Sequence, residues 1–485
     1  RRVSQYGGSG VNILTLHRGD TDVHKLKFPK ETVTDAAYET QYVPDAWDAI
    51  VRWGNAEGSD HGHMVVLNPA AALRRVENPE YVVETLAAHG ISTRYYRPAH
   101  TRVPKVRARY RIHVCDLRTV AVYRASKKGY RRVRALGTKQ MQRAREMAVR
   151  TAYVLGLHFA CVEIGKLNKK KFVPMAVNPN PALTKVTGRL YAKAIALAVL
   201  RRQKRLLGPR KPLVLGADLE FIMRRRKGGI IYASRYFPRR GSIGYDQQGS
   251  RRYRGAHPIV EVRPAPTPDP LELVERIRLL LKRAAARTPR RGVRWEAGSL
   301  PVRSFPIGGH IHFSGVELTT ELLRALDNYV AFPLMLLENP VRARRRRAKY
   351  GWLGEFRWES YGGFEYRTPS SWIVGPQFAA AVLCLTKLVV DNYEVLNRDL
   401  FSSPEICRLF YRSEKEGSRE IFECIWGDIE ALADYPRYAA YLEIIPELVR
   451  SNRRWHETRD IRVRWGLVGP SKKRRRRSVQ VTISV

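Results

Sequence analysis

Four segments in the second half of the chain alternate ionisable and apolar residues with a period of two. The ionisable residues are Asp218 and Glu220, Glu261 and Arg263, His310 and His312, and Glu365 and Arg367. In a β-strand, residues i and i+2 lie on the same face, so each segment directs two such side chains to one side of a sheet. If the four strands adjoin, they form a concave wall of carboxylate, imidazole and guanidinium groups. The alternative is that each pair marks a solvent-exposed face of an antiparallel sheet.

The pattern of apolar residues predicts both strands and helices in the second half. Strands are predicted at 213–222, 259–263 and 308–314, and helices at 270–286, 320–338 and 377–396. Asp269 and Pro270 are typical of a helix start, and Leu273, Ile277 and Leu281 would form a buried ridge. Pro333 is expected to kink the second helix, because proline has no N–H for the helical bond.

The first half mixes short strands with helices. Strands are predicted at 11–16 and 64–67, a strand pair at 111–114 and 120–123, and a hairpin at 159–164 and 172–177. Helices are predicted at 79–89, capped by Asn78, and at 139–155, ended by Gly156. An apolar helix at 190–200 and a basic, proline-containing stretch at 201–212 separate the halves. We therefore expect domains at 1–207 and 208–460, followed by a basic C-terminal tail at 461–485.

Length and cysteine usage indicate a globular intracellular protein. A chain of 485 residues can form two or three domains with large cores. No apolar run approaches the length of a membrane span, and the chain starts without an apolar leader, so we expect neither a membrane segment nor a secretion signal. The 5 cysteines are scattered and never in a CxxC spacing. That pattern favours a reducing, cytoplasmic location over a disulfide scaffold or a zinc knuckle.

The charge balance is the unusual feature of the composition. The chain has 88 lysines and arginines and 45 acidic residues, which gives a formal net charge of +43. Such a charge favours polyanionic partners such as nucleotides, acidic polymers or nucleic acid, although it also fits a generally basic surface. Local basic runs occur at 342–347, expected on a solvent-exposed helix face or loop, and at 472–477 in the tail. Because no sequence-reading motif is present, we expect nucleic acid to be bound non-specifically if it is bound at all.

The residue types of the four segments suit a metal and phosphate site. Glu220, Glu261 and Glu365 offer hard oxygen ligands for Mg²⁺ or Mn²⁺, and His312 or His310 can ligate Mn²⁺ or contact a phosphate. Three arginines, Arg263, Arg357 and Arg367, can neutralise a phosphoryl group during its transfer. Such a site could hold ATP while its γ-phosphate passes to a carboxylate. An amine would then attack the acyl phosphate and form an amide.

Five motifs of the second half together resemble the type 2 carboxylate–amine ligases. They are residues 216–221 (GADLEF), 261–264 (EVRP), 308–314 (GGHIHFS), 350–357 (YGWLGEFR) and 364–372 (FEYRTPSSW). These amidoligases share the fold of glutamine synthetase and glutamate–cysteine ligase, so the resemblance implies an antiparallel sheet funnel with two or three divalent metals. By motif position, it implies metal ligands at Glu220, Glu261, His312 and Glu365, and phosphate-side arginines at Arg357 and Arg367. Asp246 matches a further acidic position.

A second resemblance covers residues 68–183. A helix ending in Leu155-Gly156, an acidic strand and then Asn178-Pro179 are similar to the C-terminal half of an ATP-grasp ligase. This resemblance implies that Arg111 is a phosphate- or substrate-side arginine, Glu163 a metal ligand and Asn178 the asparagine of the second strand. The family's glutamate two residues before the asparagine is Ala176 here, and residues 91–110 contain no glycine for a phosphate-binding loop. We therefore expect a reduced ATP-grasp module that does not bind ATP productively.

Together these patterns predict an α+β fold, in which a glutamine-synthetase-like sheet funnel with packed helices follows a smaller, reduced ATP-grasp-like α+β domain. The predicted function is an ATP-dependent carboxylate–amine ligase that uses Mg²⁺ or Mn²⁺. Its substrates would be a small-molecule or peptide carboxylate and an amine. The alternative is a non-catalytic protein, polyanion-binding or structural, on an inactive ligase scaffold.

Alternatives stay open at individual residues of the predicted site. His310 could be a core histidine whose ring is satisfied by a backbone carbonyl. Arg263 could form a structural ion pair on the sheet, since buried arginines usually pair. Glu355 and Glu359 are expected at the surface, because glycine and serine flank them.

Overall fold

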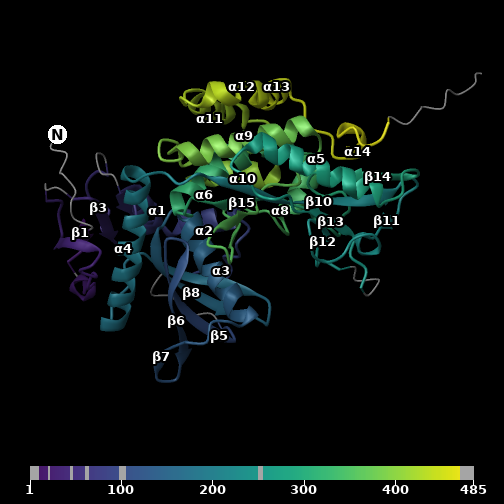
Figure 1. Cartoon of the computed structure of the whole chain (residues 1–485). Coiled ribbons are helices and arrows are strands. Elements are labelled where there is room, and N and C mark those ends of the chain that lie inside the picture. Colours follow the sequence, from purple (N-terminus) through teal and green to yellow (C-terminus); the bar gives the residue numbers. More distant parts are fainter. Residues whose placement is uncertain are drawn as a thin grey trace, which may run out of the picture.

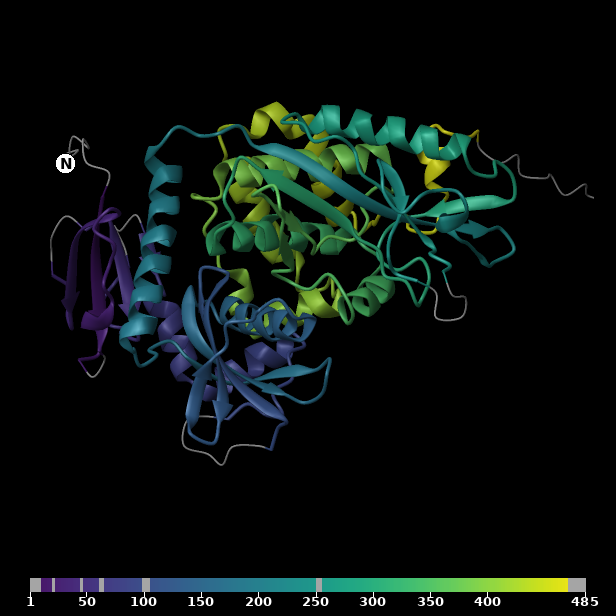
Figure 2. The ribbon, with the colours of Figure 1, turned by 60° about the horizontal axis from the view of Figure 1, so that its bottom comes forward.

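The computed structural model describes residues 10–19, 22–43, 47–60, 65–97, 105–249 and 255–469. It is a mixed α and β protein with three sheets, of 4, 5 and 8 strands. The first two sheets belong to the first half of the chain, and the third forms the centre of the larger second half (Figure 1). Figure 2 shows helix α4 standing beside the first sheet, at the point where the chain crosses to the second half.

The first sheet is entirely parallel, with the strand order β2-β1-β3-β4. Its strands are β1 (Val11–His17), β2 (Val33–Glu39), β3 (Ala49–Trp53) and β4 (Val65–Leu67). Trp53 stacks on Phe159 with ring centroids 4.9 Å apart, and Tyr191 of α4 meets Trp53 edge-on. Strands β1 and β4 coincide with predicted strands. Strand β2 lies at the edge of the sheet and is mostly exposed, so it lacks the apolar run by which a strand is predicted.

The second sheet is antiparallel, with the strand order β7-β6-β5-β8-β9. Its strands are β5 (Ala108–Cys115), β6 (Arg118–Ser126), β7 (Gly129–Arg132), β8 (Phe159–Lys166) and β9 (Phe172–Asn178). Both predicted strand pairs are confirmed. Helix α3 covers one face of this sheet with the buried side chains of Met141, Ala144 and Ala148. On the other face, α4 crosses the sheet and the hydroxyl of Tyr191 contacts His113 at 3.2 Å.

The third sheet has the strand order β12-β13-β10-β15-β17-β16, and β11 and β14 also pair with β10. Its strands are β10 (Val214–Arg225), β11 (Ile230–Ile231), β12 (Ile243–Tyr245), β13 (Ile259–Val262), β14 (Val293–Glu296), β15 (Gly309–Ser314), β16 (Phe356–Trp358) and β17 (Phe364–Tyr366). The strands of the four alternating segments are thus consecutive neighbours, β13-β10-β15-β17. Every pair among them is antiparallel.

The predicted helices are present with shifted ends, whereas the helix at 70–77 and the five helices between 404 and 464 were not predicted. In the first half they are α1 (Ala70–Glu77), α2 (Pro79–Ala88), α3 (Lys139–Val154) and α4 (Lys185–Leu207), with a 3₁₀ turn at Val23–Lys25. In the second half they are α5 (Pro270–Ala286), α6 (Thr320–Leu326), α7 (Phe332–Leu337), α8 (Pro340–Arg347), α9 (Pro376–Asn392), α10 (Pro404–Arg412), α11 (Arg419–Glu430), α12 (Tyr435–Leu442), α13 (Ile444–Arg450) and α14 (Ile461–Arg464), with 3₁₀ turns at Ala233–Arg235 and Leu400–Ser402. The predicted helix at 320–338 contains a π-helical segment, Asp327–Ala331, directly before the turn that holds Pro333. The irregularity expected at the proline is therefore a wide turn next to it.

The two halves are joined by a buried ion-pair network on α4. This helix continues to Leu207, so residues 201–207 form part of it. Asp116, in the turn between β5 and β6, lies 2.6 Å from the guanidinium of Arg201 and 2.8 Å from that of Arg202. Arg202 also contacts Glu321 of α6 at 2.6 Å, and Glu321 contacts the ring of His158 at 2.7 Å. One guanidinium therefore connects the second sheet, the crossing helix and the ligase-like half.

The folded body continues past residue 460. Ile461 and Trp465 are buried, and Arg462 donates to Asp460 while its guanidinium lies over the ring of Trp295. The basic run at 472–477 lies outside the described residues. Among the helices of the described ranges, none is both long and apolar enough to cross a membrane.

We predict that Arg202→Met destabilises the protein by about 3–5 kcal/mol, because it leaves the buried Asp116 without its main partner. Burial alone would raise the pKa of Asp116, but attraction to Arg202 outweighs it and lowers the pKa to about 2. The stabilisation is therefore complete above about pH 4 and is lost as the pH falls toward 2. Urea unfolding should show a difference between variant and wild type that shrinks over this range.

The matched control is Arg408→Met. Arg408 also joins the two halves, through Glu84 at 2.8 Å, but this pair is exposed to solvent. Its loss should cost about 1 kcal/mol or less. Equal losses of stability in the two variants would contradict the conclusion that Arg202 is the main ion-pair connection between the two halves.

Candidate active site

The ionisable side chains of the four strands share one face of the third sheet. Asp218 lies opposite His310 in the ladder, Glu220 opposite Glu261, and His312 opposite Glu365. Residues directly opposite each other on neighbouring strands point to the same face. The intervening apolar residues of β10 are buried on the other face, against which α5 packs. The alternation seen in the sequence is therefore a division between a polar wall and a helix-covered core.

A cavity of about 410 Å³ opens along this polar face. Six residues predicted from the sequence line it: Glu220, Asp246, Glu261, Arg263, Arg357 and Arg367. Four further charged or imidazole residues line its wall: Asp218 of the alternating segments, His310, which the sequence offered as an alternative to His312, and Arg239 and Arg240, which the sequence analysis missed. Arg239 and Arg240 are adjacent and exposed, and carry no motif that could have identified them. Asp218 and His310 had a signal, since each lies two residues from a predicted ligand.

Three side chains beside the cavity could hold a metal ion. The ligand atoms of Asp218, His312 and Glu365 all lie within 4.8 Å of one another. His312 Nε2 and Glu365 Oε2 are both buried; the first lies 3.3 Å from Asp218 Oδ1 and the second 2.7 Å from a guanidinium nitrogen of Arg357. Two carboxylates and one imidazole form a donor set that suits Mn²⁺ or Mg²⁺. The residues present therefore fit a divalent cation.

His310 lies between two carboxylates. Its Nδ1 is 2.7 Å from Asp218 Oδ1 and 2.9 Å from Glu365 Oε1, and its Nε2 contacts the hydroxyl of Tyr350. The alternative of a core histidine satisfied by a backbone carbonyl is wrong, because its partners are side chains of the site. Burial alone would lower the pKa of His310, but the two carboxylates raise it to about 10. The protonated ring links β10, β15 and β17 through charge.

The arginines surround Glu365. Arg357 lies 2.7 Å from Glu365 Oε2, and Arg367 lies 2.6 Å from Oε1. Arg367 also donates to the hydroxyl of Tyr350 at 2.9 Å. Arg263 forms an ion pair with Glu261, the structural role left open by the sequence, and still faces the cavity. Two guanidinium groups are thus positioned next to the candidate metal ligand.

Glu220 is a buried carboxyl group of the wall. The backbone N–H of Gly308 donates to its Oε2 at 2.6 Å. Burial raises its pKa to about 7, and the neighbouring charges of Asp246 and Asp218 act in the same direction. A cation next to such a carboxyl group would favour its ionised form.

The basic run at 342–347 is only partly exposed, contrary to the prediction. Arg346 and Arg347 of α8 are 1% and 5% exposed. Arg346 donates to the carbonyl oxygens of Ile307 at 2.7 Å, Thr368 at 2.9 Å and Pro369 at 2.8 Å. It thereby fixes the segments just before β15 and just after β17. The spacing of Ala343, Arg346 and Arg347 at i, i+3 and i+4 is the signal that could have indicated one buried helix face.

The prediction that Glu355 and Glu359 lie at the surface is also wrong. Glu355 is 9% exposed, and the N–H of Gly351 donates to its carboxylate at 2.7 Å. Burial raises its pKa. Glu359 accepts a bond of 2.8 Å from Arg357. Glu355, in the loop between α8 and β16, also lies 3.7 Å from Arg367, so both carboxylates contact arginines of the site.

The residues of the ATP-grasp resemblance lie on the second sheet and not in the cavity. Arg111 and Glu163 are directly opposite each other on β5 and β8. The carboxylate of Glu163 lies 3.5 Å from Arg109 and 3.7 Å from Arg111, so two guanidinium groups compensate its charge. The side chain of Asn178 accepts from the N–H of Asn180 at 2.8 Å.

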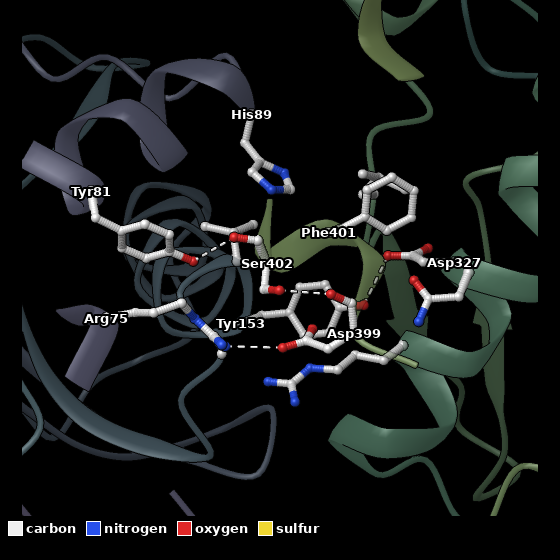
Figure 3. Close-up of a pocket in the computed structure, with 13 residues that line it drawn as sticks. Arg75, Tyr81, His89, Tyr153, Asp327, Asp399, Phe401 and Ser402 are labelled. Carbon is white, nitrogen blue, oxygen red and sulfur yellow. Dashed lines mark hydrogen bonds and ion pairs between the residues drawn. The ribbon is translucent and has the colours of Figure 1, made fainter. Parts of the chain in front are cut away.

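A second, much smaller pocket marks the joint between the halves (Figure 3). Its volume is about 20 Å³, enough for one water molecule and too small for a substrate. At its wall, Asp327 accepts bonds from Tyr153 of α3 at 2.8 Å and from Tyr366 of β17 at 2.7 Å. Tyr366 lies between Glu365 and Arg367, so one carboxylate connects the first half to the strand that carries the site.

Comparison of the sequence with protein families identifies the class of protein to which this chain belongs. Residues 215–467, just over half of the chain, match the family described as phage phiEco32-like COOH.NH2 ligase-type 2. The chain belongs to this family, which confirms the resemblance of its second half to carboxylate–amine ligases.

No curated protein sequence matches the chain. Solved structures that are similar to parts of it include the ATP-grasp ligase PsnB in complex with precursor peptide PsnA2 and AMPPNP, at 10% identity over 40% of this chain and 98% of that chain, with a TM-score of 0.31. Macrocyclase MdnB from Microcystis aeruginosa MRC is 13% identical over 39% and 99%, with a TM-score of 0.28. A bifunctional glutathione synthetase from Pasteurella multocida is 11% identical over 55% and 52%, with a TM-score of 0.33. Similarities this low carry no argument about function.

We predict that Arg346→Met destabilises the protein by about 3–5 kcal/mol, since three buried carbonyl groups lose their donor. Arg346→Lys should be destabilising as well, because an ammonium group cannot present the planar fork of donors. Chemical unfolding measures both effects. Arg345→Met on the exposed face of the same helix is the control and should change stability by about 0.5 kcal/mol or less. Equal unfolding midpoints for the variants at positions 345 and 346 would refute this role.

Proposed function

We propose that this protein is an ATP-dependent ligase that joins a carboxylate to an amine in the cavity of the third sheet. One observation carries the proposal: acidic, imidazole and guanidinium groups from four neighbouring strands converge on a single cavity of about 410 Å³. Membership of a carboxylate–amine ligase family supports amide formation as the reaction. The substrates would be a small-molecule or peptide carboxylate and an amine.

Mg²⁺ or Mn²⁺ would be held by Asp218, His312 and Glu365, with Glu220, Glu261 and Asp246 as further acidic groups of the wall. Such an ion, when bound, supplies charge neutralisation between the phosphates of ATP and the incoming carboxylate. The closeness of the ligand atoms of Asp218, His312 and Glu365, within 4.8 Å of one another, supports this assignment.

The reaction would proceed in two displacements. A carboxylate oxygen of the substrate attacks the γ-phosphorus of ATP, the bond between that phosphorus and the β,γ-bridging oxygen breaks, and ADP leaves. The amine then attacks the acyl carbon, inorganic phosphate leaves, and the proton of the amine passes to a carboxylate of the wall. Arg357 and Arg367 would stabilise the charge on the transferring phosphoryl group, and Arg263 would contribute from the opposite side of the cavity.

For the fold we propose a glutamine-synthetase-like arrangement of the second half and a reduced ATP-grasp-like module in the first, with the boundary at the end of α4. Arg111, Glu163 and Asn178 would be the positions that correspond to nucleotide and metal contacts in such a module. The ion pairs of Glu163 with Arg109 and Arg111, together with Ala176, support a module that does not turn over ATP.

We predict that Glu365→Gln lowers metal- and ATP-dependent phosphate release by about 100-fold or more, since it removes a candidate ligand and the partner of two arginines. The assay screens pairs of amino acids, peptides and polyamines for the release of phosphate. Glu275→Gln on the exposed face of α5 removes the same charge and should leave the rate unchanged. Full turnover by the Glu365 variant would refute the proposed site. If the wild type shows no metal-dependent phosphate release with any pair of substrates, the result would favour a non-catalytic scaffold.

Mn²⁺ should also stabilise the protein without any substrate. At a concentration 100 times the dissociation constant, binding adds about 2.7 kcal/mol to the free energy of unfolding. Thermal unfolding with and without Mn²⁺ measures this, and His312→Ala should remove the stabilisation while folding normally. A metal-induced shift that is the same in wild type and variant would place the ion elsewhere.

A further inference from the structure

The second sheet carries a concentration of positive charge that the ligase cavity does not use. Strands β5, β6 and β7 project from the body of the molecule, with β7 at the tip (Figures 1 and 2). Between Lys105 and Arg145 the sequence contains 14 lysines and arginines but a single acidic residue, Asp116. Asp116 is buried and already bound by two arginines of α4. The projecting part is therefore almost purely cationic.

Seven of these cations, on or next to the three projecting strands, are exposed and form no ion pair among the described residues. They are Arg107, Arg124, Lys127, Lys128, Arg131, Arg132 and Arg134. Some exposed arginines of other elements pair with glutamates, as Arg278 does with Glu275 and Arg450 with Glu423. Unbalanced exposed cations create a positive potential that attracts polyanions.

Tyrosines alternate with the cations on the open face of the sheet. Arg132 of β7, Tyr123 of β6, Arg111 of β5 and Glu163 of β8 form one continuous row across four strands. The guanidinium of Arg111 lies 4.0 Å from the centre of the Tyr130 ring. Helix α3 packs on the opposite face, so these side chains are open to a ligand.

We propose that this face of the second sheet, together with the turn between β6 and β7, binds single-stranded nucleic acid without sequence preference. A row of cations with almost no intervening acid matches a polymer that has a negative charge at every unit. Tyrosine rings next to guanidinium groups also offer stacking surfaces for bases, which an acidic peptide would not need. The surface lies on a different sheet from the ligase cavity, so the proposal does not depend on the ligase activity.

Fluorescence anisotropy of a labelled 20-nucleotide oligo-dT tests the proposal with the full-length chain. Wild type should bind, and the affinity should fall steeply as salt rises. The triple variant Lys127→Gln, Lys128→Gln, Arg132→Gln should bind about tenfold or more weakly. Because each phosphate contact on a single strand contributes about 0.7 to the slope of log affinity against log salt, that slope should decrease in magnitude by about 2.

A matched control removes the same charge from a distant surface. Arg287, Arg290 and Arg291 are exposed at the end of α5 and in the loop after it, within the ligase half. Their replacement by glutamine should leave both affinity and slope unchanged. Tyr123→Leu should weaken binding about tenfold with the salt slope preserved, since it removes stacking and not charge. Thermal unfolding confirms that this variant is folded.

Three results would overturn the proposal. The first is no binding of the oligonucleotide by wild type at low salt. The second is equal weakening by the hairpin triple variant and by its charge-matched control, which would indicate only a generally basic molecule. The third is tighter binding of poly-glutamate than of oligo-dT with the same sensitivity to the hairpin variant, which would identify the face as a docking site for acidic peptides.

Discussion

The register of β10 against its neighbours is the constraint on which the site depends. A slip of one residue would turn Asp218 and Glu220 toward the core and bring Leu219 into the cavity. The apolar residues of the strand prevent this, because they are buried on the face against which α5 packs. Each neighbouring strand repeats the same division. The hydrophobic effect on one face of the sheet therefore determines the arrangement of charges on the other.

Charges this close together require compensation within the site. Asp218 and Glu365 share the ring of His310, and Arg357 and Arg367 both contact Glu365. A buried ion is costly unless its partners are in place, so the groups that hold the strands are as necessary as the groups that react. Arg346 holds the strands in place by donating to backbone carbonyl oxygens. At the joint between the halves, Asp327 accepts hydrogen bonds from Tyr153 and Tyr366. The first half of the chain therefore supports the strand that carries the site.

Local patterns were sufficient to predict much of this arrangement. Period-two alternation located the four central strands, and side-chain caps such as Asn78 and Asp269 located helix starts. The contacts of Arg346 could not be predicted, because they join residues 22–39 positions apart and leave no periodic trace. The burial of Glu355 was missed for the same reason, since its loop is covered only after the sheet has formed. The edge strand β2 was missed because exposed strands need no apolar run.

The central claim is that the polar wall of the third sheet holds a divalent cation next to the phosphates of ATP. Anomalous diffraction from crystals grown with Mn²⁺ and a non-hydrolysable ATP analogue tests it most directly. We expect a manganese peak within bonding distance of Asp218, His312 and Glu365, and phosphate density near Arg357 and Arg367. A cavity without a peak, with manganese and nucleotide bound at Glu163 on the second sheet, would contradict the account.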